Sequence, residues 1–195
     1  MSTKDHQSEP IESASETLQR IFDGHGSVLG SQMADESSRY DVLKKTDFPK
    51  PQRTRRIAVA NQKGGVGKTT STVNTAAALA NKGAQVLVID MDPQGNASTA
   101  LGVSHASGEP SVYDVIEGRS DLGDVITVCP DFPTLDVVPA SIDLSGAELE
   151  VADLPNRNTL LKEALDLYLR QSDKHYDYVF IDCPPSLGLL VRSEE

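Results

Sequence analysis

Apolar positions are distributed unevenly along the 195 residues of this chain. The first 52 residues are polar and rich in Ser, Glu and Asp, and their apolar residues are too sparse to offset the entropy of ordering the backbone. From Ile57 onward, short apolar runs alternate with segments of helical periodicity. We therefore expect residues 1–52 to be a disordered tail and linker, and residues 53–195 to be the folded domain. Within the tail, residues 15–22 have the spacing of a short amphipathic helix, which is typical of a docking element or of a transient helix without a partner.

The apolar runs predict parallel strands that are joined by helices. The run at 57–61 ends in a glycine-rich loop, residues 69–82 have high helix propensity, and residues 84–90 form a second buried run. Together they predict a strand–helix–strand unit of the length that a right-handed parallel crossover needs. Further elements are short helices at 111–118 and 121–126, a strand at 134–140, an amphipathic helix at 158–170 and a final strand at 176–186. The pattern predicts an α/β fold with a mostly parallel sheet and helices on both faces.

Composition narrows the classes of function. The chain has 29 acidic residues against 18 basic ones and a formal charge of −11, which disfavours a globally basic nucleic-acid binder. Cys129 and Cys183 lack the spacing of a metal pair and fit small buried side chains in a reducing compartment. No apolar run approaches the ~20 residues of a membrane span, and the N-terminus lacks the hydrophobic core of a secretion signal. We therefore expect a soluble, cytoplasmic protein without a membrane partner.

The segment between the first predicted strand and helix has the chemistry of a phosphate-binding loop. Its glycines let the backbone curl around phosphate oxygens, and the unpaired N–H groups at the helix start favour an anion. Lys68 is placed to neutralise the β and γ phosphates, and the Thr69 hydroxyl is placed to hold Mg²⁺. The strict pattern fails at one position, since Gln62 stands where its first glycine is expected. The candidate nucleotide-binding residues are Lys63, Gly64, Gly65, Val66, Gly67, Lys68, Thr69 and Thr70.

Aspartates follow two of the other predicted strands, at the edge where a parallel sheet binds its ligands. Asp182 ends the last strand and is a candidate Mg²⁺ ligand, although an aspartate at a strand end is also common as a turn or helix-capping residue. Asp90 and Asp92 flank one residue of extended chain, so both point the same way. Either could orient or deprotonate a water that attacks the γ-phosphate. The residues alone do not decide between Asp90 and Asp92.

Segments of the chain also resemble a known family. KGGVGKTT at 63–70, DMDPQGNAS at 90–98 and YVFIDCPPSLGLL at 178–190 resemble the signatures of the ParA/Soj chromosome-partitioning ATPases, which have a deviant Walker A loop. The resemblance extends over about residues 55–190 and has every motif in the expected order. It implies a P-loop NTPase-type sheet that uses ATP and Mg²⁺.

The resemblance also implies roles for individual residues. Lys63 would reach across an ATP-sandwiched homodimer to the partner's phosphates, and Asp92 would position the attacking water. Lys63 and Asp92 are therefore the candidate catalytic residues, while Thr69 and Asp182 are the candidate metal-binding residues. The resemblance further implies an ATP-state homodimer that binds DNA non-specifically at the nucleoid, and a ParB-type centromere-binding protein that stimulates hydrolysis and release.

The end of the chain departs from the family pattern. Relatives continue past DCPPSLGLL through several more strands and helices, whereas this chain stops at Glu195, so we expect a fold that is incomplete at its C-terminal end. The adenine pocket, much of the dimer surface and the DNA-binding residues would then lie in the missing part. Gln62 and the ending VRSEE favour a partition ATPase over a MinD-like positioning ATPase, which ends in a basic membrane helix. A non-catalytic nucleotide-binding fragment or interaction module is the other alternative.

Overall fold

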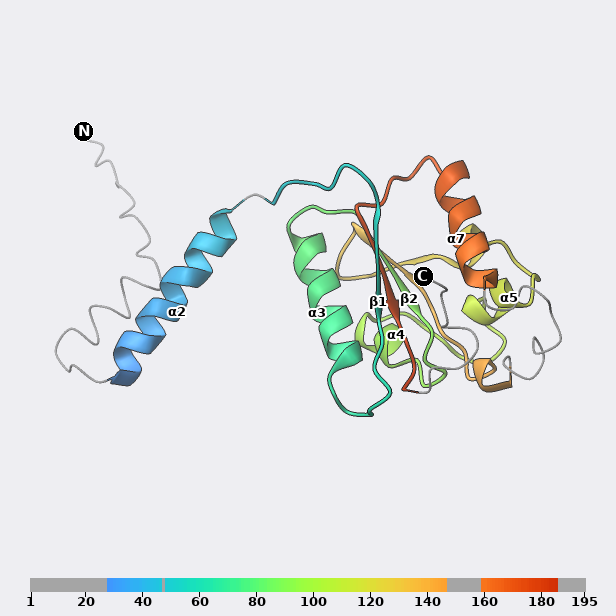
Figure 1. Cartoon of the computed structure of the whole chain (residues 1–195), viewed down its shortest axis with the longest axis horizontal. Helices are drawn as coiled ribbons and strands as arrows, with labels where there is room; N and C mark the ends of the chain where they lie inside the picture. The colour runs from blue at the N-terminus through green and yellow to red at the C-terminus, as the bar shows by residue number, and fades with distance from the viewer. Residues whose placement is uncertain (1–27, 47, 147–158, 186–195) are drawn as a thin grey trace, which may run out of the picture. The chain divides into compact units, whose positions relative to one another are not determined.

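The computed structural model describes residues 28–46, 48–146 and 159–185, and the chain divides into two compact units between Phe48 and Pro49. The first unit contains helix α2, Val28–Lys45 (Figure 1), where the sequence predicted disorder. Beyond its first three residues the helix has neither glycine nor proline, so local propensity supports it without a core. Met33 and Tyr40 are exposed on it. The short helix expected at 15–22 lies outside the described residues.

The second unit is built on a sheet with the strand order β1-β5-β2-β4-β3 in the described part of the chain. The strands β1, β5, β2 and β4 run parallel, and only the last, β3, pairs antiparallel with β4. The mostly parallel sheet that the sequence predicted is therefore confirmed. The strands are β1 (Arg55–Val59), β2 (Val86–Asp90), β3 (Thr127–Val128), β4 (Leu135–Val138) and β5 (Tyr178–Asp182).

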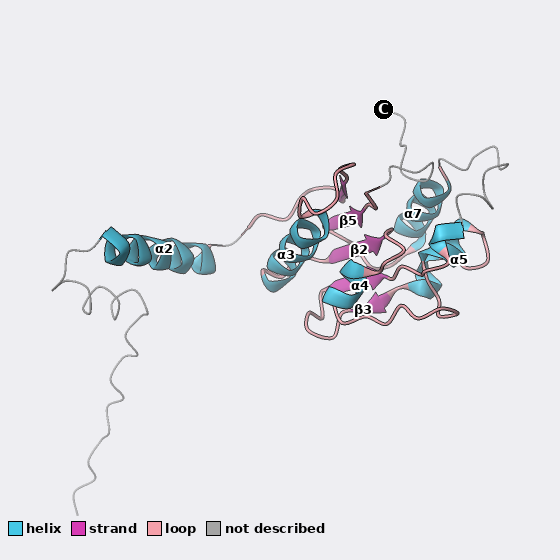
Figure 2. Cartoon of the chain, turned by 90° about the horizontal axis from the view of Figure 1, so that it is seen from below, coloured by secondary structure: helices cyan, strands magenta, loops and turns pink. Residues whose placement is uncertain are grey.

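Helices cover both faces of this sheet, as predicted. Figures 1 and 2 place the strands between α3 on one side and α5 and α7 on the other. One core joins α3 and the segment that follows α4 to the sheet, and a second core joins α5, the 3₁₀ helix η1 and α7 to its other face. The helices are α3 (Lys68–Asn81), α4 (Asn96–Ala100), α5 (Val112–Ile116), η1 (Leu122–Val125) and α7 (Leu160–Gln171).

Side-chain size and position explain how the layers pack. Ala76 and Ala80 are buried on α3, and these small side chains allow the helix to lie close against the valines of β2. Gly83 follows α3 with a φ of 79°, a left-handed conformation that ends the helix. On the other face, α7 buries Leu165 and packs its predicted apolar stripe against the second core.

Position in the sheet also sets the burial of each strand. All residues of β2 are buried, because the strand has neighbours on both edges and helices on both faces. In contrast, β1 is at one edge of the sheet, and only Val59 of its residues is partly buried. The chain that leaves β1 therefore enters the phosphate loop at an open border of the domain.

Candidate functional site

The strand order brings the predicted site segments to one edge of the sheet. β5 lies between β1 and β2, and in the register of the sheet Asp182 is level with Val59 on one side and with Asp90 on the other. The loop at 60–67 follows β1, and the turn that begins at Asp92 follows β2. Because these strands are parallel, the loop, the turn and Asp182 emerge at the same carboxyl edge.

The glycine loop has the backbone conformation that its sequence predicts. Gly65 and Gly67 have φ values of 72° and 85°, and Gly67 is the N-cap of α3. A Cβ atom at either glycine would meet no other atom within 4 Å, so the left-handed backbone, and not crowding, requires glycine here. The space in front of the helix start is open, and the unpaired N–H groups there favour an anion.

Asp182 is tied to the first turns of α3 by hydroxyl groups. The Thr69 hydroxyl donates to Oδ2 of Asp182 at 2.7 Å, and the Thr72 hydroxyl donates to Oδ1 at 3.1 Å. Asp182 is fully buried. Thr72 was not among the predicted residues, although its position three residues after Thr69 places both hydroxyls on the same side of the helix. The interpretation of Asp182 as a helix cap does not fit these contacts.

The electrostatics of Asp182 show which charges surround it. Burial raises the pKa of Asp182, while the hydrogen bonds from Thr69 and Thr72 lower it. The negative charge of Asp92 raises this pKa as well, and the positive charge of Lys68 lowers it. Asp92 and Lys68 therefore both lie within electrostatic reach of the Asp182 carboxylate. A hydroxyl and a carboxylate in direct contact, beside a lysine, form a donor set that suits Mg²⁺ and phosphate oxygens.

Asp90 and Asp92 have different surroundings, which the sequence could not distinguish. Asp90 is fully buried, and its oxygens accept hydrogen bonds from the Ser98 hydroxyl and from the backbone N–H groups of Ser98 and Asp92. Burial raises the pKa of Asp90 to about 6. Asp92 is only partly buried, and its Oδ1 accepts the Gln94 N–H at 3.0 Å. The geometry thus favours Asp92 as the carboxylate that can meet a water molecule.

The turn after Asp92 is also covered from outside by a residue that the sequence did not single out. A Cβ atom at Gly95 would lie 2.5 Å from Nδ1 of His105, so the imidazole ring packs directly on this glycine. Nε2 of His105 lies 2.8 Å from the Thr99 hydroxyl on α4. Both α4 and this packing were missed, because the sequence of α4, NASTA, has no large apolar residue that would mark a helical face.

The remaining predicted residues lie along the loop. Lys63 and Val66 are exposed, and the Lys63 N–H donates to Oδ1 of Asn61 at 2.9 Å. Gly64 has open space where a side chain would be. Thr70 is exposed, and its carbonyl oxygen accepts a hydrogen bond from the Asn74 side chain. The roles of Lys63 and of Asp92 stay predictions.

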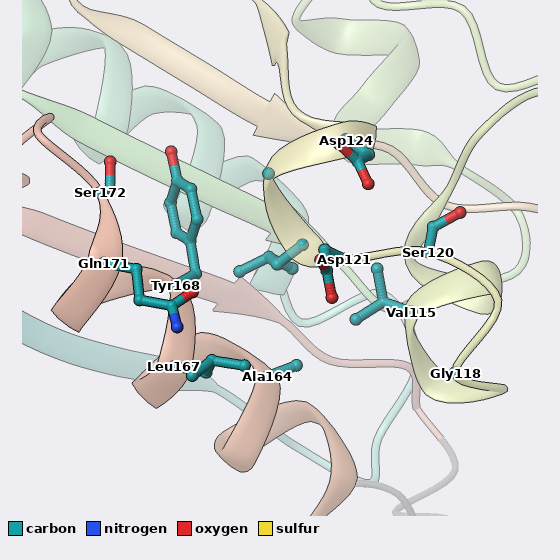
Figure 3. Close-up of a pocket in the computed structure, with 12 residues that line it drawn as sticks. Val115, Gly118, Ser120, Asp121, Asp124, Ala164, Leu167, Tyr168, Gln171 and Ser172 are labelled. Carbon is teal, nitrogen blue, oxygen red and sulfur yellow. The ribbon is translucent and has the colours of Figure 1, made fainter.

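A separate cavity lies between α7 and the chain that runs from α5 into η1 (Figure 3). It has a volume of about 380 Å³ and is lined by residues such as Val115, Asp121, Asp124 and Tyr168. None of the residues predicted for phosphate, metal or water contributes to its wall. The cavity is therefore distinct from the site at the carboxyl edge of the sheet.

Comparisons with known proteins agree with the motifs. The sequence model of a family described as an AAA domain matches residues 54–194. The sporulation initiation inhibitor protein Soj of Bacillus subtilis is 49% identical over 134 residues, which are 69% of this chain and 51% of Soj. The chromosome partitioning protein ParA of Caulobacter vibrioides is 47% identical over 134 residues, or 69% of this chain and 49% of ParA. The resemblance to the ParA and Soj proteins is thus confirmed.

A solved structure shows the same arrangement of elements. Cobyrinic acid a,c-diamide synthase from Mycobacterium smegmatis, solved with a bound ATP analogue and magnesium, superimposes with a TM-score of 0.63 and 41% identity. The match covers 70% of this chain and 54% of that one. This chain spans about half the length of the curated relatives that it matches. In the part of the chain that the structure describes, no helix combines the length and the apolar character needed to cross a bilayer.

Proposed function

The chain belongs to the AAA domain family, and from this premise we propose that it binds ATP with Mg²⁺ at residues 63–70 and hydrolyses it to drive DNA partitioning. The names of its relatives Soj and ParA support partitioning as the process. The similar structure of cobyrinic acid a,c-diamide synthase, which contains an ATP analogue and magnesium, supports ATP as the nucleotide and Mg²⁺ as the metal. Because this chain spans about half of those relatives, the activity of the whole protein is part of the proposal.

One observation carries the proposal more than any other. The Thr69 hydroxyl at the start of α3 contacts the buried carboxylate of Asp182, while Asp92 and Lys68 are close enough to shift the pKa of that carboxylate. The loop proposed to bind phosphate, the carboxylate proposed to bind the metal and the carboxylate proposed to position water therefore lie near one another. This is the arrangement that phosphoryl transfer requires, since its catalysis depends mainly on positioning and electrostatics.

Each residue of the site would have a separate role in ATP binding and hydrolysis. Bound MgATP supplies the γ-phosphate that is transferred to water and the cation that neutralises its charge. The loop N–H groups and the Lys68 ammonium bind phosphate oxygens. Thr69 and Asp182 would hold the metal, since the Thr69 hydroxyl keeps lone pairs available while it donates to the carboxylate. Asp92 orients the water and accepts its proton on a carboxylate oxygen.

Lys63 and the net charge of the chain bear on its proposed partners, which are a second copy of the chain, a ParB-type protein and DNA. Lys63 is exposed at the open border of the domain, which suits a role toward the phosphates of a second copy in an ATP-state homodimer. A ParB-type centromere-binding protein would stimulate hydrolysis and release from the nucleoid. With a formal charge of −11, this chain is a poor DNA-binding surface by itself. We place the non-specific DNA contacts in the part of the relatives that this chain does not span.

Phosphate release tests the catalytic part of the proposal. We expect Asp92→Ala to lower the rate at saturating ATP by at least 100-fold, of the size seen for general-base catalysis, while an equilibrium titration shows unchanged ATP affinity. Asp131→Ala is the control, because Asp131 is another loop aspartate, exposed to solvent, that lies outside the site. Micromolar ATP binding without turnover would instead support the non-catalytic nucleotide-binding module.

Light scattering tests the role of Lys63. We expect Lys63→Ala to bind ATP like the wild type but to remain monomeric at ATP concentrations that dimerise the wild type. Lys162→Ala removes an equally exposed lysine on α7 and should dimerise normally. A Lys63→Ala protein that dimerises with ATP would exclude the role in trans.

A further inference from the structure

Asp90 and Ser98 form a buried hydrogen-bonded pair beside the turn that carries Asp92. Asp90 is the last residue of β2 and Ser98 is on α4, and both are fully buried. Oδ2 of Asp90 accepts the Ser98 backbone N–H and the Ser98 hydroxyl, each at 2.8 Å. The Ser98 oxygen in turn accepts the Ala140 N–H at 3.2 Å, just beyond the end of β4. The pair thus connects two neighbouring strands to α4.

The same pair fixes the backbone of Asp92. The other oxygen of Asp90 accepts the Asp92 N–H at 3.1 Å. The Asp92 carbonyl oxygen accepts the Gly95 N–H at 2.8 Å, and the Met91 N–H donates to the Asp182 carbonyl at 2.9 Å. The segment from Met91 to Gly95 is therefore held at successive backbone groups. Asp90 is fully buried and both of its oxygens accept hydrogen bonds from the turn and α4, so a water reaches its carboxylate less readily than that of the partly exposed Asp92.

Because its backbone is held in this way, the Asp92 side chain is also restricted in position. Its Oδ1 accepts the Gln94 N–H at 3.0 Å, which sets the rotation of the carboxylate. Among the described residues no hydrogen bond reaches Oδ2, so this oxygen is the one that a water can approach. A displacement of about 1 Å at a catalytic group can lower a rate by about 100-fold. Loss of the Asp90–Ser98 pair would permit such a displacement, because nothing else in the described contacts holds the Asp92 N–H.

We propose that Asp90 and Ser98 are positioning residues that hold Asp92 in place for attack on the γ-phosphate. The proposal rests on the proposed function, because it concerns the same reaction. It assigns the two carboxylates of the segment DMD separate tasks: Asp90 acts through the backbone, and Asp92 meets the water. It also gives Ser98 a role in the reaction although Ser98 touches no reacting atom.

Kinetics and double variants test this assignment. We expect Ser98→Ala and Asp90→Asn to lower kcat for phosphate release at least tenfold, while the KM for ATP and the ATP affinity change less than twofold. Asp92→Ala/Ser98→Ala should be no slower than Asp92→Ala alone, because Ser98 acts only through Asp92. Ser111→Ala is the control, since Ser111 is another buried serine that bonds an aspartate but caps α5. Normal kcat in Ser98→Ala, or an equal loss in Ser111→Ala, would overturn the proposal.

A second measurement needs no turnover. Hydrogen exchange of the peptide at 91–97 should be at least tenfold faster in Ser98→Ala than in the wild type, and Ser111→Ala corrects for any general loss of stability. Unchanged exchange in Ser98→Ala would overturn the inference whatever the activity of the chain. If the wild type releases no phosphate but exchange responds as expected, the pair holds the turn and the proposed ATPase function is what fails.

Discussion

Replacing Gly95 by alanine should destabilise the domain in a way that reveals the packing of His105. Gly95 has a φ of 60°, which a residue with a Cβ atom adopts only with strain. The new Cβ would also lie 2.5 Å from Nδ1 and 2.6 Å from Cε1 of His105, far inside van der Waals contact. The imidazole must therefore leave its place, and with it the contact between His105 and the Thr99 hydroxyl.

The magnitude follows from these two effects. The left-handed backbone costs about 1–2 kcal/mol for a residue other than glycine. Loss of one hydrogen bond at a partly exposed site adds about 0.5–1 kcal/mol. We expect Gly95→Ala to lower the free energy of unfolding by about 1.5–3 kcal/mol. Gly118→Ala is a matched control with a φ of 70° and no atom within 4 Å of its Cβ, so it should lose only about 1–2 kcal/mol.

Urea denaturation followed by circular dichroism measures both variants. The decisive comparison adds His105→Ala, which removes the ring that the new Cβ would meet. In that background Gly95→Ala should cost no more than Gly118→Ala. If Gly95→Ala and Gly118→Ala already cost the same with His105 present, the ring does not pack on the turn and the reasoning is refuted.

Other predictions concern buried groups. Cys183 is buried, which raises the pKa of its thiol from 9.0 to about 11. Iodoacetamide at pH 8 should therefore label Cys183 at least 100-fold more slowly than an exposed cysteine. Equal labelling rates of Cys183 in native and urea-unfolded protein would contradict this prediction. Lys174→Met leaves the buried Asp136 carboxylate without its cation and should lower the free energy of unfolding in urea by about 1–2 kcal/mol. The value is at the low end for a buried pair, because Lys174 is partly exposed to solvent. An unchanged urea midpoint would show that this ion pair does not stabilise the domain. Burial raises the pKa of Asp90 from 3.8 to about 6, so its contribution to the free energy of unfolding is largest below pH 4 and falls by about 3 kcal/mol as pH rises through 6. Asp90→Asn should remove that part of the pH dependence. Identical profiles of unfolding free energy against pH for Asp90→Asn and the wild type would exclude this contribution of Asp90.

The sequence was sufficient for the mostly parallel sheet with helices on both faces, and it indicated the edge of the sheet at which the candidate site lies. Short apolar runs such as the one at 84–90 are typical of interior strands, and the helix at 158–170 has a clear apolar stripe. The edge of the sheet that holds the site then follows from chain direction alone, because parallel strands end together. For that reason the sequence alone predicts that the loop, Asp92 and Asp182 lie close together.

The details that the sequence missed depend on contacts between distant segments. β3 has only two residues, which is too short for a measurable period, and α4 has no large apolar residue that would mark a helical face. Helix α2 was missed because the prediction for residues 1–52 relied on their low apolar content. Low apolar content argues against a core, but it does not exclude a helix that local propensity supports. Thr72 becomes visible only when β5 is placed beside α3, since its partner Asp182 is 110 residues away.

Asp90 and Asp182 show why the partners of a carboxylate decide its role when burial and register do not. The two residues are level on neighbouring strands and both are fully buried. Asp90 accepts two of its hydrogen bonds from backbone N–H groups, which cannot turn away without moving the chain. Asp182 instead accepts from the hydroxyls of Thr69 and Thr72, which can rotate and present a lone pair. Asp182 can therefore exchange both of its partners for a cation without a movement of the chain, whereas Asp90 can release only the Ser98 hydroxyl in this way, and so Asp182 is better suited to share a metal with the Thr69 hydroxyl.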